Sequence, residues 1–223
     1  QGRGADRALM PLELRRTAFQ FLALAVCIIT AAIPAVCPAR DHVDGFDGAK
    51  PSWTMLYDRS GVRLSKHERS LDVRREGKAA ELFDVQVNVE STLLQLVYQL
   101  PMARLIDDMQ LSLWFQSTQD GATLAARVVF PNQVDPETGA PLMLLVEGDA
   151  YTKVGQWQKL NCLDIDRKVR QMLPQIRRRM QKAGAGGDID VTGRYVDTAV
   201  VSIRSSRGNS RFVVDALRFG PIV

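Results

Sequence analysis

In this 223-residue sequence, Trp114 occupies a position from which its indole ring could contact a ligand. It belongs to a segment in which apolar and polar residues alternate, and it falls at a polar position, so on a strand its indole would point away from the apolar face. A flat ring of this kind can stack on the C–H face of a sugar ring. The alternative is that a loop, a helix or the N-terminal segment covers the indole. The apolar positions of the segment are Met109, Leu111, Leu113 and Phe115.

Four polar side chains could accompany Trp114, because amides both donate and accept hydrogen bonds and a guanidinium donates several. All four would share the face of Trp114 if their strands are neighbours. These residues therefore predict a polar groove with one stacking platform, which would suit a sugar, and a second tryptophan, Trp157, is expected in the core. The four polar candidates are Gln86, Asn88, Gln116 and Arg127.

The sequence predicts no catalytic residue. Asp107 and Asp108 are adjacent, so on a strand they point to opposite faces and cannot flank a substrate together. The two histidines, His42 and His67, have no recognisable nucleophile or metal partner nearby in the sequence. No G-x-S-x-G, H-E-x-x-H, C-x-x-C or phosphate-loop motif occurs. We therefore expect a non-catalytic module, unless the natural chain continues past residue 223 as the front module of a longer glycoside-active protein.

The elements that must position Trp114 are strands. Alternation of period two gives each strand one apolar and one solvated face, which is typical of antiparallel sheets. About eight to ten such segments separated by turn signals predict an all-β antiparallel sandwich, or jelly roll. The region 40–78 is less regular and is expected to add edge strands around 52–56. The predicted strands lie at 83–89, 94–100, 109–116, 124–130, 142–147, 156–162, 195–204 and 211–219.

One basic helix is predicted to interrupt the strands, starting at Asp164 or Asp166, with a kink or a break at Pro174. Its polar face is rich in Arg and Lys, which could contact an envelope protein, a membrane surface or an anionic polymer. The alternative is a solvated helix that packs across an edge of the sandwich. The residues we assign to partner contact are Arg177, Arg178 and Arg179.

The N-terminal segment has the layout of an export signal. Arg15 and Arg16 precede an apolar run at 18–39, and small residues near Ala39 suit a signal peptidase. The run is also long enough for an uncleaved signal anchor, which would contact the membrane through residues 17–39. A lipoprotein cysteine at Cys27 or Cys37 is a third alternative. We therefore expect 1–39 to be a signal peptide or anchor forming an N-terminal apolar helix, and 40–223 to be one jelly-roll domain, secreted or held at the cell envelope.

The charge of the chain does not indicate a nucleic-acid partner. The formal net charge is +4, and residues 40–223 carry 25 Lys and Arg against 23 Asp and Glu. A nearly balanced domain lacks the strong positive field of a nucleic-acid-binding protein. With three Cys and two His in the whole sequence, a zinc cluster is also unexpected.

Five short segments occur in a characteristic order: Gly45–Gly48 followed by Trp53, then Leu111–Phe115, Gly155–Leu160, Tyr195–Val200 and Phe212–Leu217. Together they resemble the galactose-binding-like jelly-roll superfamily, which includes many carbohydrate-binding modules of exported bacterial proteins. The resemblance covers roughly residues 43–223. It implies a carbohydrate-binding role with a glycan as partner; the second candidate is an envelope protein-interaction domain that uses the basic helix.

The same resemblance implies a structural calcium ion between the opening acidic residue and the closing strand, here Asp47 and Asp215. Calcium prefers several carboxylate and carbonyl oxygens. Two positions depart from the family pattern, because Asp47 replaces the usual Glu and Ala216 replaces the second Asp of the closing pair. The alternative is that both aspartates are ordinary turn or cap carboxylates.

Overall fold

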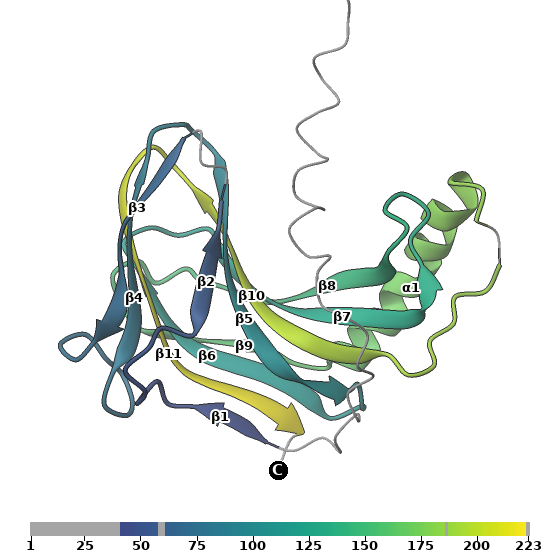
Figure 1. Ribbon diagram of the computed structural model, residues 1–223, viewed down its shortest axis with the longest axis horizontal. Coiled ribbons are helices and arrows are strands. Elements are labelled where there is room, and N and C mark those ends of the chain that lie inside the picture. Colours follow the sequence, from purple (N-terminus) through teal and green to yellow (C-terminus); the bar gives the residue numbers. More distant parts are fainter. Residues whose placement is uncertain (1–40, 58–60, 186, 222–223) are drawn as a thin grey trace, which may run out of the picture. The chain divides into compact units, whose positions relative to one another are not determined.

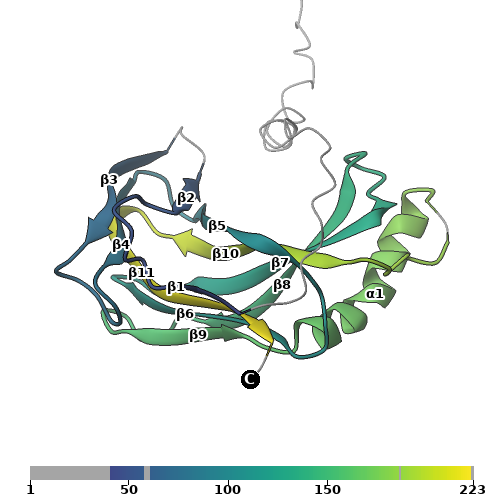
Figure 2. The ribbon, with the colours of Figure 1, turned by 60° about the horizontal axis from the view of Figure 1, so that its bottom comes forward.

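The computed structural model describes residues 41–57, 61–185 and 187–221, which form two antiparallel sheets packed face to face (Figures 1 and 2). We name the five-stranded sheet A and the six-stranded sheet B. Sheet A has the order β2 (Trp53–Leu56), β5 (Thr92–Arg104), β10 (Tyr195–Ser205), β7 (Ala122–Val134) and β8 (Pro141–Ala150). Sheet B has the order β3 (Val62–Ser70), β4 (Ala80–Val87), β11 (Gly208–Pro221), β6 (Met109–Ser117) and β9 (Gln158–Cys162), and β1 (His42–Asp44) also pairs with β11.

The chain changes sheets repeatedly, as in a jelly roll. β4, β6, β9 and β11 belong to sheet B, whereas the intervening β5, β7, β8 and β10 belong to sheet A. Neighbouring strands in both sheets are antiparallel. The predicted sandwich with one inserted helix is therefore confirmed. The apolar helix predicted near the N-terminus lies outside the described residues.

The core lies between the two sheets and follows the alternation of the sequence. On β6, Leu111, Leu113 and Phe115 have no exposed surface, while Trp114 between them points to the outer face of sheet B. The ring of Phe115 packs against Tyr151 at a centroid distance of 5.2 Å. Burial of this apolar surface is the main source of stability in such a fold.

Helix α1 (Ile165–Lys182) connects β9 to β10 and lies beside the ends of β7 and β8 (Figure 1). Its buried side chains Ile165, Val169, Ile176 and Met180 join the main core. The helix is unbroken at Pro174, so the break that we predicted as one possibility there is wrong. The apolar face holds both halves of the helix against the sandwich, which offsets the one backbone hydrogen bond that a proline cannot donate.

Across the ranges that the structure covers, no helix is both long and apolar enough to cross a membrane. The apolar run at 18–39 lies outside those ranges, so neither the signal nor the anchor prediction is tested.

Candidate functional site

A hollow of about 610 Å³ opens on the outer face of sheet B, where Trp114 of β6 meets the 71–79 and 151–157 loops. We call it the Trp114 hollow. Its lining combines two indoles, two carboxamides and three cationic side chains, and it contains no carboxylate. The lining residues are Arg75, Trp114, Lys153, Gln156, Trp157, Gln158 and Lys159.

Trp114 is half-buried at this site because the 71–79 loop reaches its ring. The guanidinium of Arg75 lies 4.7 Å from the ring centroid, and the indole Nε1 donates a hydrogen bond of 2.7 Å to Glu76 Oε1. This hydrogen bond, together with the guanidinium of Arg218, holds the pKa of Glu76 below its ordinary value. The indole is thus fixed in orientation, and one of its faces carries an arginine.

The buried carboxylate of Asp215 holds the 71–79 loop over Trp114. Asp215 lies opposite Trp114 in the pairing of β11 with β6, just before a bulge in which Ala216 has a φ of 47°. Its Oδ2 accepts the backbone N–H groups of Arg75 at 2.6 Å and Glu76 at 2.9 Å. Burial raises the pKa of Asp215, and the hydrogen bonds from the loop oppose that rise.

Hydrogen bonds of the Tyr151 and Gln158 side chains hold the 151–157 loop on the other side of the hollow. The buried hydroxyl of Tyr151 lies 2.6 Å from the carbonyl oxygen of Lys153 and 2.9 Å from that of Gln156, and its single proton can be donated to one of them at a time. Gln158 Oε1 accepts the backbone N–H groups of Thr152 and Lys153. Hydrogen bonds from within the chain therefore hold both loops, which reduces the entropy lost on binding.

Two of the predicted binding residues, Trp114 and Gln116, come together at this site. Gln116 Nε2 donates to the carbonyl oxygen of Gly155 at 2.8 Å, so its amide supports the 151–157 loop and does not line the hollow. Gln86 lies on the same outer face but opposite Asn209, six residues along β11 from the partner of Trp114. That offset is roughly 20 Å, which separates Gln86, and Asn88 beyond it, from the hollow.

Arg127 lies in the other sheet, which corrects its predicted grouping with Trp114. It belongs to β7 of sheet A, where its guanidinium forms two hydrogen bonds of 2.8 Å with the carboxylate of Asp197. β6 and β7 follow one another in the sequence but belong to opposite sheets. Arg127 therefore cannot share a face with Trp114.

Trp157 is not a core residue of the sandwich, in contrast to our prediction. It is half-buried, lines the Trp114 hollow and packs on a small apolar cluster of Ala80, Leu82 and Val213 on the outer face of sheet B. Trp157 also lies just before strand β9, which begins at Gln158. Lys153, Lys159 and Arg75 were not singled out from the sequence either, because no local pattern links three separate segments.

The two aspartates predicted to bind calcium both contact the 71–79 loop through backbone amides. Asp47 is exposed and its Oδ1 accepts the N–H of Lys78 at 2.9 Å, whereas Asp215 Oδ1 is buried with no hydrogen-bond partner. Within the described ranges, no three His, Cys, Asp or Glu side chains are grouped so as to hold a metal ion. Two carboxylates already bonded to amides fall short of the six to eight oxygens that calcium takes. Calcium stays a prediction that rests on the family resemblance.

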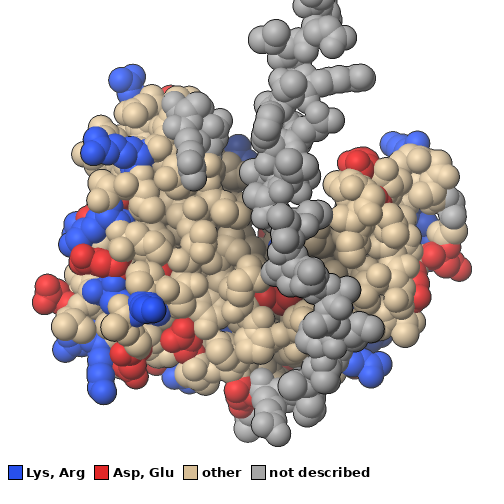
Figure 3. Space-filling model, viewed as in Figure 1, with Lys and Arg blue, Asp and Glu red and all other residues tan. Residues whose placement is uncertain are grey.

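The basic face of α1 is largely compensated by carboxylates. Arg177 pairs with Asp188 at 3.0 Å and Arg179 pairs with Asp135 at 2.9 Å, whereas Arg178 forms no ion pair with any residue that the structure describes. Acidic side chains accordingly lie beside the basic ones around α1 (Figure 3). The contact of this face with a partner protein stays a prediction.

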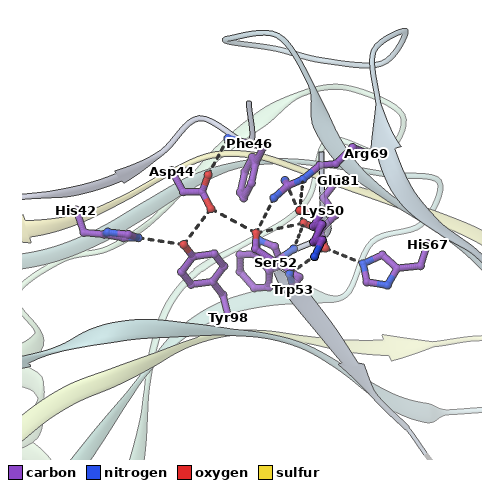
Figure 4. Close-up of polar contacts among 10 residues, drawn as sticks. All are labelled: His42, Asp44, Phe46, Lys50, Ser52, Trp53, His67, Arg69, Glu81 and Tyr98. Carbon is purple, nitrogen blue, oxygen red and sulfur yellow. Dashed lines mark hydrogen bonds and ion pairs between the residues drawn. The ribbon is translucent and has the colours of Figure 1, made fainter. Parts of the chain in front are cut away.

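A second polar cluster, away from the Trp114 hollow, contains both histidines (Figure 4). Glu81 of β4 has no exposed surface, and its carboxylate accepts the backbone N–H groups of Ser52 at 3.0 Å and Trp53 at 2.9 Å. It also contacts His67 Nε2 at 2.6 Å and Arg69 Nη1 at 3.1 Å. Two backbone amides, the Ser52 hydroxyl, His67 and Arg69 surround this carboxylate, so we interpret Glu81 as the residue that ties β2 and β3 to β4.

The remaining members of the cluster hold β1 against sheet A. The hydroxyl of Tyr98 donates to Asp44 Oδ2 at 2.9 Å and lies 3.0 Å from His42 Nε2 (Figure 4). Burial, followed by the hydrogen bond to Asp44, raises the pKa of Tyr98. Ser52 Oγ contacts Glu81 and Asp44 but neither histidine, so these residues do not form a Ser–His catalytic pair.

No family model matches the sequence, and no match emerges among the curated proteins compared with it. The fold is similar to carbohydrate-binding modules. One is the family 11 module of the cellulosomal cellulase Lic26A-Cel5E of Clostridium thermocellum, with 13% sequence identity and a TM-score of 0.49 over 83% of this chain and 97% of that chain. A family 11 module from Clostridium thermocellum in complex with a beta-1,3-1,4-mixed-linked tetrasaccharide has 14% identity and a TM-score of 0.49, covering 84% of this chain and 98% of the other.

A third similar structure is the CBM22-1 xylan-binding domain of Xyn10C from Paenibacillus barcinonensis. It has 12% identity and a TM-score of 0.46, over 84% of this chain and 98% of that chain.

Proposed function

We propose that this chain is a non-catalytic carbohydrate-binding module whose ligand lies in the Trp114 hollow. The observation that carries the proposal is that Trp114 and Trp157, 43 residues apart in the sequence, line one hollow together with free polar side chains. Saccharides combine apolar C–H faces with many hydroxyl groups. Indole rings match the first feature, and amide or ammonium groups match the second.

The state of the two loops favours a binding role over a purely structural one for the hollow. Asp215, Tyr151, Gln116 and Gln158 direct their hydrogen bonds to the loop backbones. The side chains of Arg75, Lys153 and Gln156 are exposed at the rim as a result. A rigid frame that presents exposed polar groups around two indoles can bind a sugar with little reorganisation.

We further propose that the module acts outside the cytoplasm, either secreted or held at the cell envelope, as the basic pair and apolar run before residue 40 indicate. A saccharide-binding role suits that location, since extracellular and envelope polysaccharides are accessible there.

The proposal is tested by titrating the full chain with a panel of neutral and acidic oligosaccharides while tryptophan fluorescence is recorded. The Trp114→Ala variant is expected to lose affinity by about tenfold or more, because it removes the stacking platform. The matched control is Tyr195→Ala, which removes a half-buried aromatic ring from the strand β10 of sheet A and is expected to leave binding unchanged.

If Tyr195→Ala abolished binding and Trp114→Ala did not, the module would bind carbohydrate through sheet A, and the site proposed here would be wrong. If no oligosaccharide bound to the unmodified chain, the carbohydrate-binding function itself would be refuted. Circular dichroism of each variant confirms that the sandwich is intact before its affinity is compared.

A further inference from the structure

The Trp114 hollow is lined by three cationic side chains and by no carboxylate, and the carboxylate of Glu76 lies beside it, bonded to Trp114. Arg75, Lys153 and Lys159 line it, and in the described part of the chain none of the three forms an ion pair within 4.0 Å. Elsewhere several arginines are paired, for example Arg127 with Asp197 and Arg211 with Asp84. Three cations without an ion pair thus lie around two indoles in this hollow.

A second, smaller hollow of about 260 Å³ adjoins the first and shares Lys159 with it. Ser112 of β6 lies opposite Asn161 of β9 and Arg218 of β11, one outward position away from Trp114. Successive outward positions on a strand are about 7 Å apart, so the two hollows lie in one row along β6. Lys159 stands between them, and the polar side chains Gln110, Ser112 and Asn161 continue the row.

The charges of the second hollow are closer to balance than those of the first. Arg218 pairs with Glu76 at 3.0 Å, and Asp41 is among the lining residues. The unpaired charge of the row is therefore concentrated at Lys159 and at the Trp114 end. A ligand that lies along β6 would contact mainly uncharged polar groups in the second hollow, and cations beside the indoles in the Trp114 hollow.

We infer that the ligand of this row is an acidic oligosaccharide, one whose carboxylate or sulfate group binds Lys159 and Arg75 while a sugar ring lies against Trp114 or Trp157. The inference rests on the proposed function and specifies its ligand class. An anionic group would form charge-assisted hydrogen bonds with cations that have no ion-pair partner in the described structure, and such bonds are roughly twice as strong as neutral ones.

The position of Arg75 gives a physical reason for a preference for acidic over neutral sugars. Its guanidinium covers one face of Trp114 at 4.7 Å from the ring centroid, a favourable cation–π contact. A neutral sugar that stacks on that face must displace the guanidinium without offering it a new partner. An acidic sugar offers a carboxylate or sulfate to the displaced arginine.

A single-stranded nucleic acid also combines flat rings with anionic groups, but the observations favour a saccharide. The domain has nearly equal numbers of basic and acidic residues, and only three cations line the Trp114 hollow. A polyanion with a phosphate at every nucleotide would place phosphates beside Asp41 in the second hollow and beside Glu76, which contacts Trp114 and Arg218. An oligothymidylate therefore serves as a competing ligand in the test.

The experiment compares binding of a galacturonic acid trisaccharide and of its methyl ester to the full chain by titration calorimetry. The two ligands differ in charge and share the sugar rings. We expect the ester to bind about tenfold more weakly, as expected when charge-assisted bonds are lost, and the affinity for the acid to fall as salt is raised. A sulfated galactan trisaccharide shows whether sulfate can replace the carboxylate.

Two variants remove one charge each. Lys159→Gln is expected to lower the affinity for the acid about tenfold and to leave the affinity for the ester unchanged, because only the charged ligand uses the ammonium group. Lys182→Gln removes the same charge from the exposed last turn of α1 and is expected to change neither affinity.

Equal affinities for the acid and the ester would overturn the acidic-ligand inference and leave carbohydrate binding intact. Failure of every saccharide to bind would overturn both proposals. Tighter binding of the oligothymidylate than of any saccharide would replace the inference with a nucleic-acid ligand.

Discussion

Asp215 shows how one buried carboxylate can organise a surface site. It has no exposed surface, yet its Oδ2 fixes the backbone of Arg75 and Glu76, and the side chains of those two residues hold the indole of Trp114. Asp215 itself does not line the hollow. It acts as a positioning residue, and its substitution should change the hollow through the 71–79 loop.

The raised pKa of Asp215 predicts how stability depends on pH. Because burial raises the pKa above the ordinary 3.8, the folded chain binds a proton in a pH range where the unfolded chain has released it. The free energy of unfolding therefore decreases as pH rises from about 3.8 through the raised pKa, and is flat above it. Asp215→Asn removes this titration and keeps an oxygen acceptor for the two amides.

We expect Asp215→Asn to be at least as stable as the unmodified chain at pH 7, with the difference shrinking as pH falls toward 4. Urea denaturation at both pH values measures it. Asp215→Ala, which leaves both amides without their acceptor, should lose about 1–3 kcal/mol. A less stable Asp215→Asn, together with a melting temperature that EDTA lowers in the unmodified chain alone, would instead establish the predicted calcium ion.

The sequence predicts the direction of Trp114 correctly, because the alternation along β6 is local. It does not predict that Arg75 covers the ring, since this contact depends on a loop about 40 residues away and on the carboxylate of Asp215. The hydrogen bond of the Gln116 carboxamide could not be predicted for the same reason. The outward position of Gln116 follows from alternation, but its hydrogen bond to Gly155 depends on the fold of a distant loop.

Among the elements, strand β3 could not be predicted from the hydrophobic pattern of the sequence. Its residues Val62–Ser70 are mostly polar, so no apolar face is apparent. In the structure His67 and Arg69 pair opposite Phe83 and Glu81 of β4, and both side chains reach the buried Glu81 carboxylate. Polar residues thus occupy the inner face of an edge strand, which a rule based on hydrophobic alternation cannot recognise.

Glu81→Ala is expected to destabilise the fold by about 3–5 kcal/mol, because it leaves a buried arginine without its counter-charge. The matched control is Glu68→Ala on the same edge of sheet B, which removes an exposed pair with Lys66 and should cost about 1 kcal/mol or less. Urea denaturation at neutral pH measures both. Equal losses would mean that the Glu81 cluster contributes no more than a surface ion pair.

For the whole molecule, the apolar faces of most strands are predictable, but the distribution of the strands between two sheets is not. Arg127 is the case in point: β6 and β7 are joined by a short turn, and their outward faces nevertheless lie on opposite sides of the sandwich. A hairpin within one sheet would have given the same sequence pattern. Only the long-range pairing of β6 with β9 and β11 separates the two arrangements.

The export prediction concerns the complete chain. If residues 1–39 are a cleaved signal, the protein recovered outside the cytoplasm should begin at Arg40, as N-terminal sequencing would determine. Ala39→Arg should block cleavage, because the enzyme requires small residues near the cleavage site. Recovery of the uncleaved, unmodified chain in the membrane fraction would instead establish the signal anchor.

The Trp114 hollow is assembled from four stretches of chain that are far apart in the sequence: the 71–79 loop, β6, the 151–159 segment and the closing strand β11. None of them forms the hollow until both sheets and both loops are in place. Ligand binding is therefore linked to complete folding, and at 100 times its dissociation constant a saccharide should add about 2.7 kcal/mol to the free energy of unfolding. If the proposed saccharide binding is correct, the ligand-bound chain should resist unfolding and proteolysis better than the unbound chain.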